Sequence, residues 1–379
     1  MSWGKIIMLL IFTTVMVFVS IAVSALITVR CTATTDLSGW TRILIGCGIA
    51  LIFVSPFLLR YPSTPGSGSI YNALTYITYF LFVCVFLFFC LMIARDITWI
   101  IGKWLIPALP SPFRATVVAK ANLALLFLVI ALSAYSLYEG MRVPRIKEVT
   151  LYSTKITSPL KIVSLPDIHI HRALSARKLK GIIQATNNLK PDIIALPGDI
   201  IDDRADTIKD LVSLLHEFKS SLGTYVTDGN HEIYTGTKEA QHQFKKERIT
   251  YLHNEAQRVR PDVIVVGVPD IQSSRIGLPP DMKKALPQTD SFTILLAHSP
   301  KMFDMPDNTA DLQLSGHTHG GQIFPFHILT WLSNHHYLAG LYQDGNRNLY
   351  VSRGAGQWGP QMRLLAPSEI SVINVLPKK

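Results

Sequence analysis

Five groups of potential metal ligands occur between residues 167 and 319, and each follows a short apolar run. Apolar runs of this length, bounded by turn residues, predict buried β-strands. Side chains at the ends of such strands meet at one edge of an α/β sheet, where these folds collect ligands. The runs with their candidate ligands are Lys161–Leu165 with Asp167 and His169, Asp192–Leu196 with Asp199 and Asp202, Gly223–Thr227 with Asn230 and His231, Phe292–Ala297 with His298, and Asp311–Leu314 with His317 and His319.

The donor atoms of these groups are carboxylate and amide oxygens and imidazole nitrogens. Seven of these nine donors are enough to hold two metal ions, and two ions a few ångström apart form a clamp for phosphoester hydrolysis. All four Cys lie before residue 91, so residues 141–379 offer neither a thiolate metal site nor a disulfide framework. A donor set of nitrogen and oxygen alone suits Mn, Fe or Zn.

Taken in order, the motifs Asp-x-His, Gly-Asp-x-x-Asp, Gly-Asn-His-Glu, a lone His and Gly-His-x-His resemble the calcineurin-like metallophosphoesterase family. The resemblance covers about residues 161–376. The motif Gly-His-Thr-His-Gly-Gly-Gln, with the later Leu349–Gly354, resembles the branch that includes membrane-associated bacterial phosphodiesterases and UDP-diacylglucosamine hydrolases. Pro166, Pro197 and Asp228 differ from the residues most common at these motif positions in the family, but none of them replaces a ligand.

The resemblance implies a metal-dependent phosphoric ester hydrolase with two divalent ions. A hydroxide between the ions would attack phosphorus, His231 would protonate the leaving oxygen, and Asp202 would orient His231. One carboxylate would bridge the ions. The ligands implied by the family pattern are Asp167, His169 and His319 for one metal, Asn230, His298 and His317 for the other, and Asp199 as the bridge.

Other polar residues near the motifs have simpler interpretations. Asp202 could instead cap the helix that follows it, and Glu232 fits a structural role better than a ligand role. His171 is expected on the surface, with substrate phosphate as the alternative, and Arg353 either contacts a phosphate or forms an ion pair. Three histidines in an apolar aromatic loop could line a substrate rim: His327, His335 and His336.

The first 140 residues are predicted to form a transmembrane region. They hold 8 basic and 3 acidic residues, against 28 and 23 in the remainder. Four apolar runs are long enough to be spans, at about residues 6–29, 43–59, 74–94 and 117–137. Ile97–Leu109 is too short to cross and suits an interfacial helix. Basic residues after the last run, including Arg142 and Arg145, either meet anionic headgroups or are ordinary solvated charges.

Residues 141–160 are expected to form a linker and a first strand, and residues 161–379 a metallophosphoesterase domain. Strand and helix patterns alternate along this domain and end in a run of strands, which indicates two packed sheets with helices outside. This agrees with the four-layer α/β/β/α sandwich that the resemblance implies. The helices expected from their spacing are Ser175–Leu189, Thr207–Phe218 and Thr237–Arg248.

The sequence therefore favours a membrane-anchored phosphoesterase that hydrolyses a phosphodiester or pyrophosphate. The four spans, the apolar loop Ile323–Leu332 and the branch resemblance favour a lipid-linked substrate. The alternatives are a tethered phosphodiesterase for soluble nucleotides and a non-catalytic scaffold; a scaffold should have lost ligands, and every ligand position here is filled. The expected partners are the ester substrate and membrane lipids, not nucleic acid. The expected location is a bacterial inner or plasma membrane.

Overall fold

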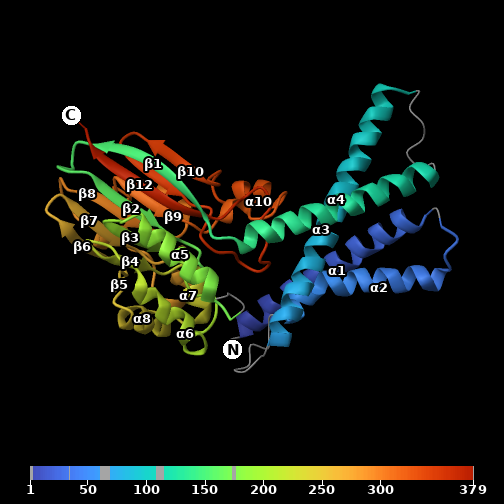
Figure 1. The fold of residues 1–379 in the computed structure, drawn as a ribbon, viewed down its shortest axis with the longest axis horizontal. Helices are drawn as coiled ribbons and strands as arrows, with labels where there is room; N and C mark the ends of the chain where they lie inside the picture. Colours follow the sequence, from blue (N-terminus) through green and yellow to red (C-terminus); the bar gives the residue numbers. More distant parts are fainter. Residues whose placement is uncertain (1–2, 34, 60–68, 108–114, 173–175, 379) are drawn as a thin grey trace. The chain divides into compact units, whose positions relative to one another are not determined.

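The structure, a computed structural model, describes residues 3–33, 35–59, 69–107, 115–172 and 176–378. The chain divides into two compact units, Met1–Leu137 and Tyr138–Lys379. Figure 1 shows long helices in the N-terminal part, and strands with short helices in the rest. This order of elements confirms the expectation of apolar helices followed by an α/β domain, while the domain boundaries at residues 140 and 160 stay predictions.

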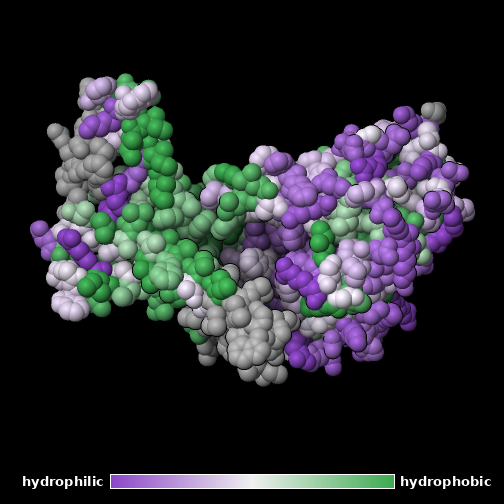
Figure 2. Space-filling model, turned by 180° about the vertical axis from the view of Figure 1, so that it is seen from behind, coloured by the Kyte–Doolittle hydropathy of each residue, from purple (hydrophilic) through white to green (hydrophobic). Residues whose placement is uncertain are grey.

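Four long helices form the N-terminal part: α1 (Trp3–Thr32), α2 (Gly39–Leu59), α3 (Ser69–Leu105) and α4 (Ala115–Met141). Each contains a segment long and apolar enough to cross a membrane. No more than 28% of any of these segments is buried, so most of their apolar side chains face outward. Figure 2 shows the resulting hydrophobic surface. The segments are Thr13–Thr32, Gly39–Pro56, Ala73–Leu105 and Ala119–Met141.

Helix α3 corrects one expectation. The sequence predicted that a span stops at Arg95 and Asp96 and that Ile97–Leu109 forms a separate interfacial helix, but α3 continues through this point without a break. The two charges are tolerated because they are paired. Asp96 accepts hydrogen bonds from Arg30 and Arg95, and Arg95 also donates to Asn122. Burying a paired charge in apolar surroundings costs far less free energy than burying an isolated one.

The second unit contains two six-stranded sheets. Strand order is β1-β12-β2-β3-β4-β5 in the first sheet and β10-β11-β9-β8-β7-β6 in the second. Strands β2, β3 and β4 are parallel, as are β7, β8 and β9, so their carboxyl ends share an edge in each sheet. The bounds are β1 Arg145–Ser153, β2 Leu160–Ser164, β3 Ile193–Pro197, β4 Thr224–Thr227, β5 Thr250–Tyr251, β6 Glu255–Arg260, β7 Val263–Gly267, β8 Phe292–Leu296, β9 Leu312–Ser315, β10 Gly340–Asp344, β11 Arg347–Val351 and β12 Glu369–Pro377.

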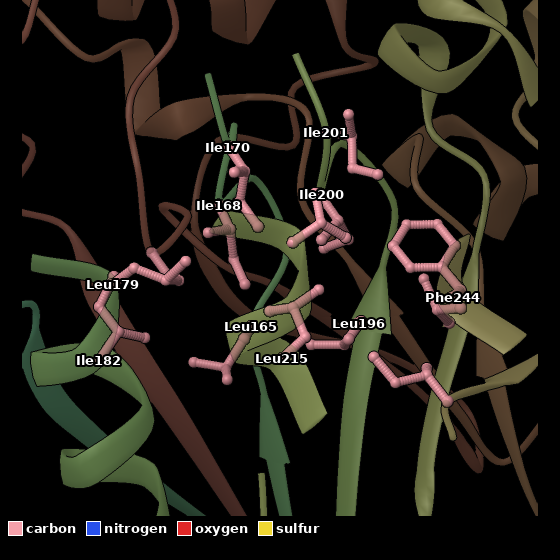
Figure 3. Packing of buried hydrophobic residues seen from close by; sticks show 14 of the residues in the cluster. Leu165, Ile168, Ile170, Leu179, Ile182, Leu196, Ile200, Ile201, Leu215 and Phe244 are labelled. Atoms are coloured by element: carbon pink, nitrogen blue, oxygen red, sulfur yellow. The ribbon is translucent and has the colours of Figure 1, made fainter. Parts of the chain in front are cut away.

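The two sheets pack face to face around a core of buried aliphatic side chains, among them Ile162, Ile373 and Ile294. Helix α5 (Ala176–Asn188) covers the outer face of the first sheet with Leu179 and Ile182 (Figure 3). Helix α9 (Met282–Ala285) and η4 (Pro300–Asp304) cover the second sheet. These layers confirm the α/β/β/α arrangement. The other helical elements are η1 Ala205–Thr207, α6 Lys209–Val212, η2 Ser213–Glu217, α7 Asn230–Thr235, α8 Thr237–Lys246, η3 Ile271–Ile276, η5 His319–Gly321 and α10 Phe326–Ser333.

The prediction of a single helix over Thr207–Phe218 is wrong. The segment forms η1, α6 and η2 instead, with a change of helix type at Ser213. The Ser213 hydroxyl donates to the carbonyl of Asp210, and the His216 ring contacts the carbonyl of Ser213. Side-chain bonds of this kind compete with regular helical bonding and account for the break.

Replacing Ile373 with Ala tests the core between the sheets. Ile373 is fully buried in β12. Truncation leaves a cavity, and the free energy of unfolding should fall by about 2–5 kcal/mol. Thermal unfolding of the detergent-solubilised chain measures the change. The control is Thr150→Ala on the exposed side of β1, and an equal shift for both variants would contradict this account.

Candidate metal centre

The candidate ligands lie in loops at the carboxyl ends of parallel strands. The first sheet contributes the loops after β2, β3 and β4, and the second contributes those after β8 and β9. Because the sheets pack face to face, these loops converge at one edge of the domain. All seven side chains are buried except His317, which is half-buried. They are Asp167, His169, Asp199, Asn230, His298, His317 and His319.

The backbone at most of these ligands is strained. A non-glycine residue with positive φ costs on the order of 1–3 kcal/mol and persists only where its surroundings hold it. Such residues concentrate at functional sites. Five of the seven candidate ligands have φ between 49° and 71°: Asp167, His169, Asp199, His317 and His319.

Two glycines of the motifs are required by the carboxylates beside them. A Cβ on Gly229 would lie 2.1 Å from Asp199 Oδ1, and a Cβ on Gly316 would lie 2.3 Å from Asp167 Oδ2. Both distances are far below van der Waals contact. The glycines in Gly-Asn-His and Gly-His-x-His therefore make room for acidic side chains from neighbouring strands.

One group of donors consists of Asp167, His169 and His319. Their ligand atoms all lie within 4.8 Å of one another. His169 Nε2 is 3.1 Å from His319 Nε2, and His319 Nε2 is 3.6 Å from Asp167 Oδ1. Three donors from the β2 and β9 loops thus point at a common position.

A second group lies around Asp199, His298 and His317. His298 Nε2 is 3.1 Å from Asp199 Oδ2, and His317 Nδ1 is 3.3 Å from His298 Nε2 and 2.9 Å from Asn230 Oδ1. Asp199 also groups with His169 and His231, whose Nε2 atoms lie 3.8 and 3.9 Å from Asp199 Oδ2. The Asp199 carboxylate therefore stands between the two groups, where a bridging ligand would have to be.

Burial controls the protonation of the site. Desolvation lowers the pKa of His169 to about 3 and that of His317 to about 4, and it also lowers the pKa of His319. These imidazoles are therefore neutral at pH 7, the form that binds metal. Burial would raise the pKa of Asp199, but the charges of His298 and His231 and the hydrogen bond to His298 together outweigh it and hold the pKa well below its usual value.

These features fit divalent cations. The neutral ring nitrogens of His169, His317 and His319 converge with carboxylate and amide oxygens, and few of these atoms carry a proton to share. The Nδ1 atom of His298 lies 3.0 Å from the carbonyl of Pro197, an arrangement that orients the ring and leaves Nε2 for a metal. Every donor is nitrogen or oxygen, which suits Mn, Fe or Zn.

His231 and Asp202 form a pair beside the donors. His231 Nδ1 is hydrogen-bonded to Asp202, while its Nε2 lies 3.9 Å from Asp199 Oδ2. Burial lowers the pKa of His231, but the Asp199 charge and the Asp202 bond outweigh it, so the pKa is raised overall. Two exposed aromatic rings flank His231, those of Tyr234 and Trp358, with centroids 5.5 and 6.3 Å away.

Glu232 is a structural residue, as the sequence suggested. Its buried carboxylate accepts hydrogen bonds from the backbone N–H groups of Gly229, Asp199, Ile200 and Ile201, at 2.7 to 3.0 Å. This carboxylate joins the loop after β3 to the loop after β4. Both loops carry candidate ligands, so Glu232 fixes their relative positions.

Arg363 is a positioning residue that the sequence did not reveal. Its guanidinium is fully buried and donates to the carbonyls of His319, Ala366 and Gly356. The bond to His319 is 3.0 Å long and holds the backbone of a candidate ligand. Arg363 lies in an irregular segment without a motif, and only its place in the folded chain identifies it.

The other polar residues considered in the sequence lie outside the donor groups. His171 contacts the side-chain amide of Gln361, and Arg353 forms an ion pair with Glu369 at 2.9 Å. His335 pairs with Asp304, while His336 packs on Trp331 and His327 on Phe324.

Comparison with known proteins identifies the family. Residues 160–321 match the family model described as calcineurin-like phosphoesterase. An uncharacterized metallophosphoesterase of Campylobacter jejuni is 37% identical over 265 residues, which cover 68% of this chain and 70% of the relative. The chain therefore belongs to the calcineurin-like metallophosphoesterase family. The resemblance noted from the motifs is confirmed.

Two further relatives differ in how much of their length is matched. An uncharacterized metallophosphoesterase of Helicobacter pylori is 39% identical over 247 residues, covering 64% of this chain and 66% of the relative. A protein of Danio rerio named transmembrane protein with metallophosphoesterase domain is 32% identical over 282 residues, which cover 69% of this chain and 62% of the relative. This chain thus spans somewhat less than two thirds of the length of these two relatives.

Glu232→Gln should weaken the metal centre without removing any candidate ligand. An amide can direct only one oxygen at four N–H donors, and the nitrogen would oppose them. Each buried donor left unpaired costs about 1–3 kcal/mol. Metal content, measured by elemental analysis, and the thermal midpoint should both fall. The matched control is Glu239→Gln on the exposed side of α8, and wild-type values for both variants would contradict this role of Glu232.

Proposed function

We propose that the protein is a membrane-anchored phosphoesterase that uses two divalent metal ions to hydrolyse a phosphodiester or a pyrophosphate. One observation carries the proposal: two groups of buried donors lie side by side, with the Asp199 carboxylate between them. A single metal ion would leave several buried donors without a partner, at a large desolvation cost.

The proposed reaction divides the work between the cations and the chain. When bound, two divalent cations supply positive charge to the phosphoryl oxygens and lower the pKa of water. His231 supplies the proton for the leaving oxygen. Its raised pKa favours the protonated ring, and Asp202 holds Nδ1 so that Nε2 remains available as the donor.

We also propose that the substrate is lipid-linked. The last candidate span, Ala119–Met141, ends just before β1 begins at Arg145. A domain attached so closely to a span works next to the lipid headgroups. The relative from Danio rerio is named a transmembrane protein, which agrees with an anchored enzyme.

A substrate panel tests the proposed substrate class. The full chain is reconstituted with Mn in lipid nanodiscs and given a diacyl nucleotide-sugar pyrophosphate, phospholipids and soluble nucleotide diesters. Preferred hydrolysis of a bilayer-embedded ester is expected. Cleavage of soluble nucleotide diesters alone would overturn the lipid-linked substrate but not the phosphoesterase. No cleavage of any ester by metal-loaded protein would overturn both.

Metal content tests the two-ion proposal directly. The purified chain reconstituted with Mn or Zn should bind two ions, because one carboxylate stands between two groups of donors. Elemental analysis with protein quantification gives the ratio. Asp199→Asn should lose both metal and activity, since the bridge is weakened. An active wild-type enzyme with one ion or fewer would contradict the proposal.

His231→Ala separates proton transfer from metal binding. The rate should fall by roughly 10²–10⁴-fold, the usual contribution of a positioned acid, while metal content stays close to wild type. The loss should be smaller for a nitrophenyl ester, whose leaving group needs little protonation. Rates on good and poor leaving groups, with elemental analysis, provide the measurement.

Two outcomes would contradict this role of His231. A loss of metal in His231→Ala would make the residue a ligand or a structural support, since its ring also lies near Asp199 and His169. An equal loss of rate for good and poor leaving groups would mean that it stabilises charge on the phosphoryl oxygens.

A further inference from the structure

Helix α10, Phe326–Ser333, has no buried residue although it is strongly apolar. Leu329 is 61% exposed, and Leu332 is 55% exposed. Residues 322–334 contain no Asp, Glu, Lys or Arg. Exposed apolar side chains that gather in this way mark a contact surface. We call this set the apolar cap: Phe324, Phe326, Ile328, Leu329, Trp331, Leu332 and Leu365.

The apolar cap is attached to the metal centre. Helix α10 follows the candidate ligand His319 by seven positions and packs against the short helix η5, which begins at that ligand. The Gln322 side chain donates to the carbonyl of Trp358, whose ring flanks His231. The cap therefore has a fixed position relative to the site of phosphoester hydrolysis.

The apolar cap is also attached to the end of the last candidate span. Within the second unit, Gly140 in the final turn of α4 accepts hydrogen bonds from Lys178 and Gln357. The segment that begins at Gln357 reaches the cap by two backbone bonds: Leu364 donates to Gln322, and Phe324 donates to Leu364.

This connection gives a short distance between the last turn of α4, which belongs to the second unit, and the cap. Gln361 lies against Gly140, because a Cβ there would meet the Gln361 carbonyl oxygen at 2.2 Å. Leu364 is three residues further along, which is at most about 10 Å of extended chain. The interfacial layer of a bilayer extends over a similar depth, since helices lying in it sink about 5–10 Å.

We propose that the apolar cap inserts into the surface of the membrane that α1–α4 span. Aliphatic side chains with Trp331 and without charge suit the boundary between headgroups and acyl chains. The span ending at Met141 places that boundary within reach of the cap. Insertion would hold the metal centre at the level of the headgroups, whichever ester it hydrolyses.

A fluorescent probe at Leu329 tests this insertion. The four native Cys, all in or beside the spans, are replaced by Ala, Leu329→Cys is introduced, and an environment-sensitive nitrobenzoxadiazole dye is attached. The full chain is placed in nanodiscs that hold one copy, made of phosphatidylcholine with or without a doxyl-labelled acyl chain. The doxyl lipid should quench the dye by about half or more, as expected for a side chain below the headgroups.

Tyr152→Cys is the matched control. Tyr152 is 66% exposed and lies near the far end of β1, seven residues after Arg145. A dye there should respond to aqueous iodide and not to doxyl lipid. Hydrolysis of a chromogenic diester within about twofold of the unlabelled chain verifies that each variant folds. Ile328→Cys, also on the exposed surface of α10, replaces Leu329→Cys if that variant does not fold.

Three results would overturn the proposal. Quenching of the Leu329 dye by iodide and not by doxyl lipid would place the cap in water. Shielding from both quenchers in one-copy discs would mean that the chain itself covers the cap. Shielding that occurs only in two-copy discs would make the cap an interface between copies. None of these results depends on the substrate, so the proposal can fail while the phosphoesterase function stands.

Discussion

The position of the Asp199 carboxylate constrains the whole catalytic domain. It is buried, accepts a hydrogen bond from the backbone of His231 and lies 3.1 Å from His298. Its own backbone has positive φ and donates to Glu232. One residue therefore joins the loops after β3, β4 and β8, and both sheets must be in register before these contacts can form.

This constraint explains why much of the site could be predicted from the sequence. The motifs Gly-Asp-x-x-Asp and Gly-Asn-His-Glu follow strands, and each contains a glycine that makes space or turns the chain. Because parallel strands of one sheet end at the same edge, the ligands after β2, β3 and β4 must be neighbours. The apolar helices and the alternation of strands and helices were equally visible, since both depend on local patterns.

The features that could not be predicted from the sequence depend on contacts with residues far away along the chain. Helix α3 passes through Arg95 and Asp96 because Arg30 and Asn122 pair with them, and no local pattern reports those partners. Arg363 contacts the candidate ligand His319, and Trp358 contacts His231, only after the segment that follows β11 folds back across the site.

The basic residues after the last span also depend on tertiary contacts. The sequence left open whether Arg142 and Arg145 meet headgroups or water. Both pair with the buried carboxylate of Glu139, at 3.1 and 2.7 Å. These ion pairs tie the last turn of α4 to the start of β1.

The pairing of β1 has a consequence for the order of events during synthesis. Strand β1 follows the last candidate span directly, yet it joins its sheet only through β12, which pairs with β1 and β2. Register partners such as Arg145 and Glu369 are separated by more than two hundred residues. At roughly 5–20 residues per second, β1 must wait some tens of seconds beside the membrane for its partner. The loops after β2, β3 and β4, which carry candidate ligands, are made during that delay, so these three strands can pair with one another before β12 completes their sheet.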